Sequence, residues 1–143
     1  QGGGDLGARI ERVLQRALRL APWAIALGAD SPGFPADTLP NAAAALADAD
    51  AVIGPAEDGG YYLLGLRRCP TGLFANLPWS TPRTREATVS RLGEHGMRVT
   101  TIRSWFDIDL ESDLQQFRAR VARGAAPRTW AVLDELDGRG RIV

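Results

Sequence analysis

The sequence predicts an α/β fold with a mostly parallel sheet, because short apolar segments alternate along the chain with segments of helical periodicity. Two extended segments lead into acidic clusters: residues 23–28 are followed by Asp30, and residues 98–102 are followed by Asp107 and Asp109. Open α/β sheets bind ligands outside the carboxyl ends of their parallel strands. The two clusters are therefore expected to converge on one site, where carboxylate oxygens suit a divalent cation.

Composition limits the classes of protein to consider. The 143 residues are expected to form a single α/β domain spanning 1–143. The 17 basic and 17 acidic residues cancel, which predicts no nucleic-acid partner and no anionic membrane surface. Cys69 is the only cysteine, which excludes an internal disulfide and a multi-thiolate zinc site. With no long apolar run and no signal-peptide pattern, the sequence favours a soluble protein of the cytoplasm.

Five segments are expected to be helical. Residues 5–20 place apolar side chains three and four positions apart, and Asp5 is a plausible N-cap. The other expected helices are 41–47, 83–94, 111–123 and 128–136. The first precedes the first strand, and the others lie between extended segments or close the chain, as a layered α/β fold allows.

Four segments are expected to be strands: 23–28, 51–54, 61–66 and 98–102, with 105–108 as a short extended piece. Residues 23–28 are continuously apolar, which is typical of a strand buried on both faces. This strand is therefore expected to lie in the centre of the sheet.

Each acidic cluster also has a purely structural explanation. Asp30 precedes Ser-Pro and could start a turn, while Asp109 or Ser112 could cap the helix that follows. Because Mg²⁺ keeps several waters and needs only one or two protein carboxylates beside ligand phosphates, Asp30 with Asp109 would be enough to hold it.

The connection 55–60 joins two acids to paired glycines. Glu57 and Asp58 could accept hydrogen bonds from sugar hydroxyls, and Gly59 and Gly60 could let backbone amides approach a ligand closely. The alternative is a hairpin-like connection with solvated acids. The tyrosines at 61 and 62 are expected to belong to the core.

Three further features carry weaker signals. The glycine-rich segment 1–7 lacks the common phosphate-loop patterns, and it is either a flexible end or a set of amides for a base or phosphate. Trp79 and Ser80 precede a helix, so Ser80 is first an N-cap candidate. His95 is the only histidine and is expected to be a solvated turn residue, which gives a Ser-His-Asp triad little support.

Taken together, five motifs resemble the DUF2064 family, which is glycosyltransferase-A-like. They are, in order, QGGGDLGAR at 1–9, GADSP at 28–32, GPAEDGGYYLLG at 54–65, PWST at 78–81 and FDID at 106–109. The resemblance implies the three-layer fold of the nucleotide-diphospho-sugar transferases, which nucleotidyltransferases share. It also implies a nucleotide-sugar or nucleoside triphosphate substrate, with Mg²⁺ or Mn²⁺ as cofactor.

The resemblance assigns roles to individual residues. Asp30 and Asp109 would hold the cation on the nucleotide phosphates and form the catalytic centre, with Asp107 as the alternative to Asp109. Asp109 is preferred because related enzymes place this ligand five residues before a helical leucine, here Leu114. The substrate contacts it implies are Gln1, Gly2, Asp5 and Gly7 on the base side, Glu57, Asp58, Gly59 and Gly60 on the sugar or acceptor side, and Trp79 and Ser80.

One departure from the family pattern produces a second hypothesis. Members of the family begin with a strand and a Gly-rich basic loop that have no counterpart before Gln1, so N-terminal strands are expected to be missing and strand 23–28 to lie near an exposed sheet edge. The first hypothesis is a magnesium-dependent glycosyltransferase or nucleotidyltransferase. The alternative is a non-catalytic truncated module that binds a partner chain, or forms a homo-oligomer, through that edge.

Overall fold

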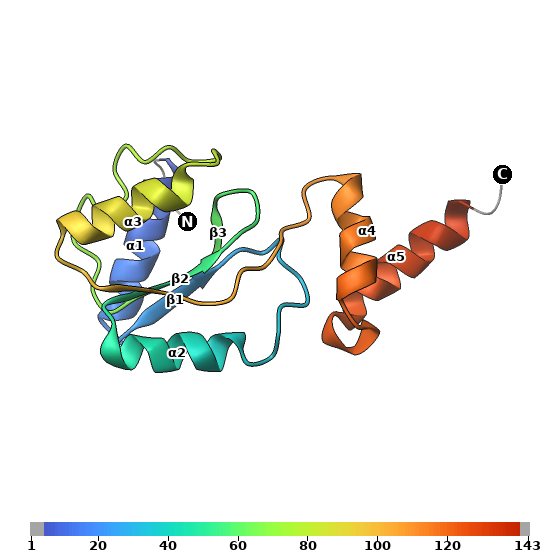
Figure 1. Ribbon diagram of the computed structural model, residues 1–143, viewed down its shortest axis with the longest axis horizontal. Coiled ribbons are helices and arrows are strands. Elements are labelled where there is room, and N and C mark those ends of the chain that lie inside the picture. Colours follow the sequence, from blue (N-terminus) through green and yellow to red (C-terminus); the bar gives the residue numbers. More distant parts are fainter. Residues whose placement is uncertain (1–4, 141–143) are drawn as a thin grey trace.

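The computed structural model describes residues 5–140, and these contain every helix and strand expected above (Figure 1). In chain order the elements are α1 (Leu6–Leu18), β1 (Ala24–Leu27), α2 (Thr38–Asp48), β2 (Ala51–Pro55), β3 (Tyr61–Leu66), α3 (Thr84–Glu94), β4 (Val99–Thr101), α4 (Glu111–Arg120), the 3₁₀ helix η1 (Arg123–Ala125) and α5 (Pro127–Gly140).

Within these residues the four strands form one sheet in the order β1-β3-β2-β4, and the sheet is mixed. β3 runs antiparallel to both β1 and β2, and only β2 and β4 pair in parallel. The expectation of a mostly parallel sheet was therefore wrong. The reason lies in the connection between β2 and β3: it spans only residues 56–60, whereas a parallel crossover needs about a dozen residues or more.

The expectation that residues 23–28 form a central strand was also wrong, because β1 lies at an edge of this sheet. The central strands are β2, which is buried along its whole length, and β3, which is buried beyond Tyr61. In β1 only Ala24 is buried, and Leu27 remains 44% exposed. A short apolar run does not by itself distinguish an edge strand from a central one, and the edge position agrees with what the family resemblance implied.

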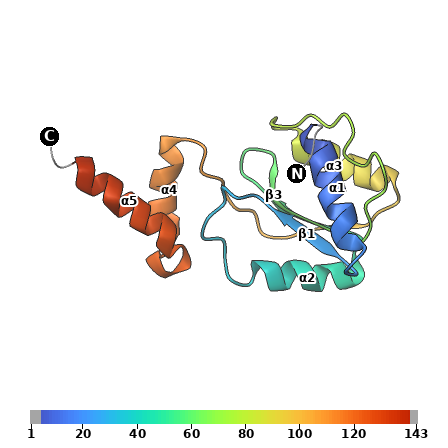
Figure 2. The same ribbon diagram turned by 180° about the vertical axis from the view of Figure 1, so that it is seen from behind.

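Helices cover the sheet in layers. α1 and α3 lie over one face and α2 over the other, while α4 and α5 lie beyond one end of the strands (Figure 1). Figure 2 shows α1 beside β1, seen from behind. Among the helices of residues 5–140, none has both the length and the apolar character that crossing a bilayer would require.

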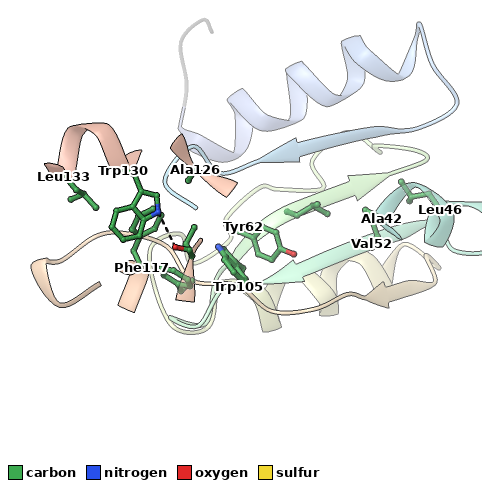
Figure 3. Close-up of a cluster of buried hydrophobic side chains, with 12 residues drawn as sticks. Ala42, Leu46, Val52, Tyr62, Trp105, Phe117, Ala126, Trp130 and Leu133 are labelled. Carbon is green, nitrogen blue, oxygen red and sulfur yellow. Dashed lines mark hydrogen bonds between the residues drawn. The ribbon is translucent and has the colours of Figure 1, made fainter. Parts of the chain in front are cut away.

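Two buried clusters hold these layers together. The first joins α1 and α3 to one face of the sheet through Leu14, Leu92 and Ile53, and it includes Phe74. The second begins at α2 and continues past the ends of the strands into α4 and α5. Figure 3 shows it as a row of side chains from Leu46 and Ala42 through Tyr62 and Trp105 to Phe117 and Trp130. The second cluster thus attaches the two C-terminal helices to the rest of the molecule.

Candidate functional site

A cavity of 440 Å³ opens at the end of the sheet where β1, β2 and β4 finish and β3 begins. Asp30 follows β1, Asp58 lies between β2 and β3, and Asp107 lies after β4. These three carboxylates, which lie far apart in sequence, line the same cavity. Its lining residues are Leu6, Ile10, Ala26, Leu27, Gly28, Ala29, Asp30, Asp58, Gly60, Tyr61, Tyr62, Leu64, Trp79, Ser80, Thr81, Thr84 and Asp107.

Backbone and side-chain hydrogen bonds join the segments of Asp30 and Asp107. The amide of Ile108 donates to the carbonyl of Asp30 over 2.9 Å, and the Ser31 hydroxyl donates to the Asp107 carboxylate. Ser31 itself is buried, at 3% exposure. A Cβ at Gly28 would lie 2.8 Å from the Asp30 carboxylate, so a side chain there would require Asp30 to move. The turn therefore presents Asp30 beside Asp107.

The pKa of Asp107 is raised above its usual value. Burial is the main cause, the Ser31 hydrogen bond opposes it, and the charges of Asp30, Asp58 and Asp109 raise it further. Three neighbouring carboxylates therefore disfavour the ionised form of Asp107. A cation bound among them would relieve this repulsion, because an opposite charge favours ionised carboxyl groups.

Asp109 differs from Asp107 in its exposure and in its position relative to the cavity. Its side chain is exposed and it is not among the residues that line the cavity. The start of α4 is capped by neither Asp109 nor Ser112 but by Asp113, whose carboxylate accepts from the amides of Asp109 and Leu110 at 3.0 and 2.8 Å. These bonds lower the pKa of Asp113. The structure thus brings Asp107 into the cavity beside Asp30 and leaves Asp109 at its margin.

The segment between β2 and β3 is a hairpin connection, and neighbouring segments hold it in place. Asp58 accepts a hydrogen bond from the amide of Gly60 over 2.8 Å. Gly59 has a φ of +95°, and a Cβ there would lie 2.3 Å from the Pro82 carbonyl oxygen. The amide of Arg85, in the first turn of α3, donates to the Gly59 carbonyl over 3.1 Å. Gly59 is therefore fixed against α3, while Asp58 and Gly60 face the cavity.

Glu57 points away from the cavity toward α4. Its carboxylate accepts from Arg120 over 2.7 Å and from Gln116 over 2.9 Å. The Arg120 hydrogen bond is the first cause that lowers the pKa of Glu57, and the Gln116 hydrogen bond is the second. The sequence proposed Glu57 as a substrate contact, but in the structure its carboxylate is occupied by two α4 side chains.

The opposite wall of the cavity is apolar and aromatic. Leu6 and Ile10 of α1 face it, together with Trp79 and Tyr61, whose rings meet edge to face at 6.4 Å. Burial raises the pKa of Tyr61 to about 12. Within the described part of the chain, the Trp79 indole nitrogen is buried without a hydrogen-bond partner. Ser80, beside it, has a φ of +57°, an uncommon conformation outside glycine.

The base-side residues expected from the sequence have mixed placements. Gln1 and Gly2 lie outside the described residues. Asp5 caps α1 by accepting from the amide of Ala8 over 2.8 Å. Gly7 is buried, and a Cβ there would lie 2.6 Å from the Phe74 carbonyl oxygen. Asp5 and Gly7 thus have structural roles at the start of α1, next to the cavity wall formed by Leu6.

Sequence reasoning missed several residues at this site. Ser31 was treated only as part of a turn, although a buried hydroxyl beside an acid is a plausible partner for a second carboxylate. Leu6 and Ile10 had a signal in their spacing of four residues, which places both on one face of α1. Arg120 gave no signal, because the sequence cannot show that α4 packs behind the hairpin.

The donor set at the acidic end fits a hard cation such as Mg²⁺, which prefers carboxylate oxygens. In residues 5–140 no group of three or more His, Cys, Asp or Glu side chains is arranged to hold a metal ion. A cation at this site would therefore take the rest of its oxygen ligands from water or from substrate phosphates, which is common for Mg²⁺.

Comparison with known proteins gives two likenesses. Residues 1–81 match the model of a family described as "Uncharacterized protein conserved in bacteria (DUF2064)". A crystal structure from Desulfovibrio desulfuricans G20, described as a "putative nucleotide-diphospho-sugar transferase", superposes with a TM-score of 0.82 at 30% sequence identity. The superposition covers 96% of this chain and 62% of that one, so the chain spans less than two thirds of its structural relative. Among curated proteins there was no significant match.

Proposed function

This chain belongs to the DUF2064 family, and from that premise we propose that it takes part in magnesium-dependent transfer of a glycosyl or nucleotidyl group from a nucleotide-sugar or nucleoside triphosphate. The fold likeness supports a glycosyltransferase-like role in coarse terms. The observation that carries the proposal further is the convergence of Asp30, Asp58 and Asp107 on one cavity at the strand ends.

The charge of the cavity explains why a cation is part of the proposal. Three of its lining residues are acidic, and none of the described lining residues is basic. A diphosphate or triphosphate approaching such a surface would be repelled unless a divalent cation lay between the two. The cation would thus serve both as a bridge to the phosphates and as the neutralising charge.

In this proposal Asp30 and Asp107 hold Mg²⁺ or Mn²⁺, and Ser31 orients the Asp107 carboxylate. Asp109 is assigned no direct contact with the cation, because it is not among the residues that line the cavity. When bound, the cation would stabilise negative charge on the phosphate oxygens during transfer. Asp58 and the amide of Gly60 would meet hydroxyl groups of the sugar or acceptor, and Trp79 and Ser80 would contact the substrate from the opposite wall.

A titration with Mn²⁺, with and without a nucleotide panel, tests this proposal. We expect Asp30→Asn and Asp107→Asn each to weaken Mn²⁺ binding by more than about tenfold, since each removes a direct ligand. Asp109→Asn is expected to have a smaller effect. Asp48→Asn is the matched control, because Asp48 is an exposed aspartate at the end of α2.

Isothermal titration calorimetry would measure the Mn²⁺ affinity of each variant. Unchanged Mn²⁺ affinity in both Asp30→Asn and Asp107→Asn would contradict the proposed site. A larger effect of Asp109→Asn than of Asp107→Asn would move the second ligand to Asp109. Thermal shifts with nucleotides and nucleotide-sugars, measured with and without Mg²⁺, would then identify the substrate class.

A second candidate function rests on the edge strand β1. The amide of Gly28 donates to the Tyr62 carbonyl, so the alternation of antiparallel pairing directs the backbone groups of Ile25 and Leu27 away from β3. Trp23 and Leu27 are 39% and 44% exposed along this edge. Such an edge suits strand addition by a second copy of the chain or by a partner.

Light scattering across a concentration series tests edge pairing. A dimer that appears in the wild type and disappears in Leu27→Lys would support it, because a charge on an edge strand opposes pairing. A monomer at every concentration would count against self-association.

A further inference from the structure

We infer that Arg120 is a positioning residue that holds two cavity-forming segments, the 56–60 hairpin connection and residues 105–107, in their relative places. The inference rests on the proposed function, because it assigns Arg120 the task of keeping Asp58 and Asp107 beside Asp30. Arg120 does not line the cavity. It acts from α4, behind the carboxylates.

The first contact of Arg120 is with the hairpin connection. Its guanidinium donates over 2.7 Å to the carboxylate of Glu57, which is the residue before Asp58. Gln116, one helical turn earlier on α4, donates to the other carboxylate oxygen over 2.9 Å. One face of α4 therefore holds both carboxylate oxygens of Glu57. This contact restrains the backbone of the connection at the residue before Asp58.

The second contact is with the segment that carries Asp107. The guanidinium carbon of Arg120 lies 4.7 Å from the ring centroid of Phe106 and 5.2 Å from that of Trp105. These distances are typical of cation–π contacts. One side chain thus contacts an ion-pair partner next to Asp58 and two aromatic rings next to Asp107.

The same aromatic residues extend the connection to the segment of Asp30. The Trp105 indole donates to the Pro32 carbonyl over 3.2 Å. Just after α4, Val121 packs against Gly33, where a Cβ would lie 2.3 Å from the valine Cγ1 atom. All three acidic segments are therefore backed by α4 and the residue that follows it, and Arg120 contacts two of them directly.

An arginine is needed here because one group must do two things at once. The planar guanidinium can stack on the rings of Trp105 and Phe106 while its N–H groups donate to Glu57. A lysine keeps the charge but lacks the planar face. Arg120→Lys should therefore retain part of the function of Arg120, and Arg120→Ala should lose it.

Mn²⁺ affinity is the first measurement. Residues that orient metal ligands typically change affinity by 10–100-fold when removed, so we expect Arg120→Ala to weaken binding about tenfold and Arg120→Lys to weaken it less. The matched control is Arg118→Ala. Arg118 lies on the same helix with similar exposure, 35% against 38%, but it pairs with Asp137 of α5. The Arg118→Ala variant should therefore bind Mn²⁺ with the same affinity as the wild type.

Hydrogen exchange of the backbone is the second measurement, and it does not depend on metal binding. Arg120→Ala should speed exchange in peptides covering both 56–60 and 103–109, whereas Arg118→Ala should not. Global unfolding monitored by denaturant separates this local effect from a general loss of stability, because a global effect would also speed exchange in β2 and β3.

These outcomes separate the inference from the proposed function. If the wild type binds no Mn²⁺ but Arg120→Ala speeds exchange in both segments, the positioning role stands and the metal site fails. If exchange in the two segments is unchanged, the inference is overturned. Where the wild type binds Mn²⁺, equal affinity in Arg120→Ala would also overturn it.

Discussion

The two sides of the cavity are built in different ways. The wall formed by α1, Trp79 and Tyr61 is fixed by packing, because it rests on the fully buried Phe74 and on the close approach of Gly7. The acidic end is carried by loops, and those loops are fixed by hydrogen bonds, one ion pair and ring contacts to Arg120. The position of the apolar wall therefore depends on buried apolar area, and the position of the acidic end depends on directional polar contacts.

This difference predicts how each side responds to change. Loss of packing affects the whole molecule, because buried side chains supply most of the stability of a small domain. Loss of a polar contact at a loop changes where a carboxylate lies but costs little stability. Function and stability should therefore separate at the acidic end and change together at the apolar wall.

The largest effect is expected at the apolar wall. Phe74 is 0% exposed, and its ring lies 6.2 Å from that of Trp79. Phe74→Ala should lower the free energy of unfolding by about 3–5 kcal/mol, because it removes a large buried side chain and leaves a cavity. Denaturant unfolding measures this, with Leu20→Ala, at 86% exposure, as the control. A loss close to that of the control would contradict the packing account.

An intermediate loss of stability is expected at Gly59, which belongs to the acidic end of the cavity but packs closely against the backbone of Pro82. Gly59→Ala should cost about 1–3 kcal/mol, since alanine is strained at a positive φ. Its Cβ would also meet Pro82. Gly72→Ala is the matched control, because Gly72 has a φ of +80° but open space around it. Thermal unfolding should show a larger loss for Gly59→Ala, and equal losses would show that the Pro82 contact is easily relieved.

The smallest effect on stability is expected at Glu57. Its pKa is lowered in the folded state, first by the Arg120 hydrogen bond, so its stabilising contribution is present above the unfolded pKa of about 4.5 and is lost as the pH falls through the folded pKa. Because its side chain is 45% exposed, that contribution should be at most about 0.5 kcal/mol and should weaken with salt.

Glu57→Gln tests the sign of this contribution. The difference in unfolding free energy between wild type and variant should be greatest near neutral pH and should shrink as the pH falls below 4.5. A difference that grows on acidification would mean that Glu57 is stabilised in its protonated form instead.

Local patterns in the sequence were enough to predict each α-helix and strand of residues 5–140, but not the 3₁₀ helix η1. Strand direction was harder to predict, although the length of the 56–60 connection already limited β3 to an antiparallel arrangement. The position of β1 could not be read from its apolar residues alone. How far an edge strand is buried depends on which helix packs against it. For β1 that helix is α1, and local sequence patterns do not show which strand a helix will contact.

The candidate site was predicted less completely than the fold. Asp30 and Asp58 carried a signal in their positions after strands, and the structure brings both into the cavity. The sequence could not show that Asp107 lines the cavity while Asp109 does not, because this depends on the path of the chain before α4. Arg120 escaped notice because its role arises entirely from tertiary contacts.

The hairpin of β2 and β3 also has a consequence for the order of folding. Its pairing is local, whereas β4 joins the sheet by pairing Val99 with Ala51, and local contacts are generally made first because they close shorter loops. On this basis the connection that carries Asp58 would form early, and the segment of Asp107 would arrive with β4. The acidic end of the cavity would then be completed only after β4 has paired with β2.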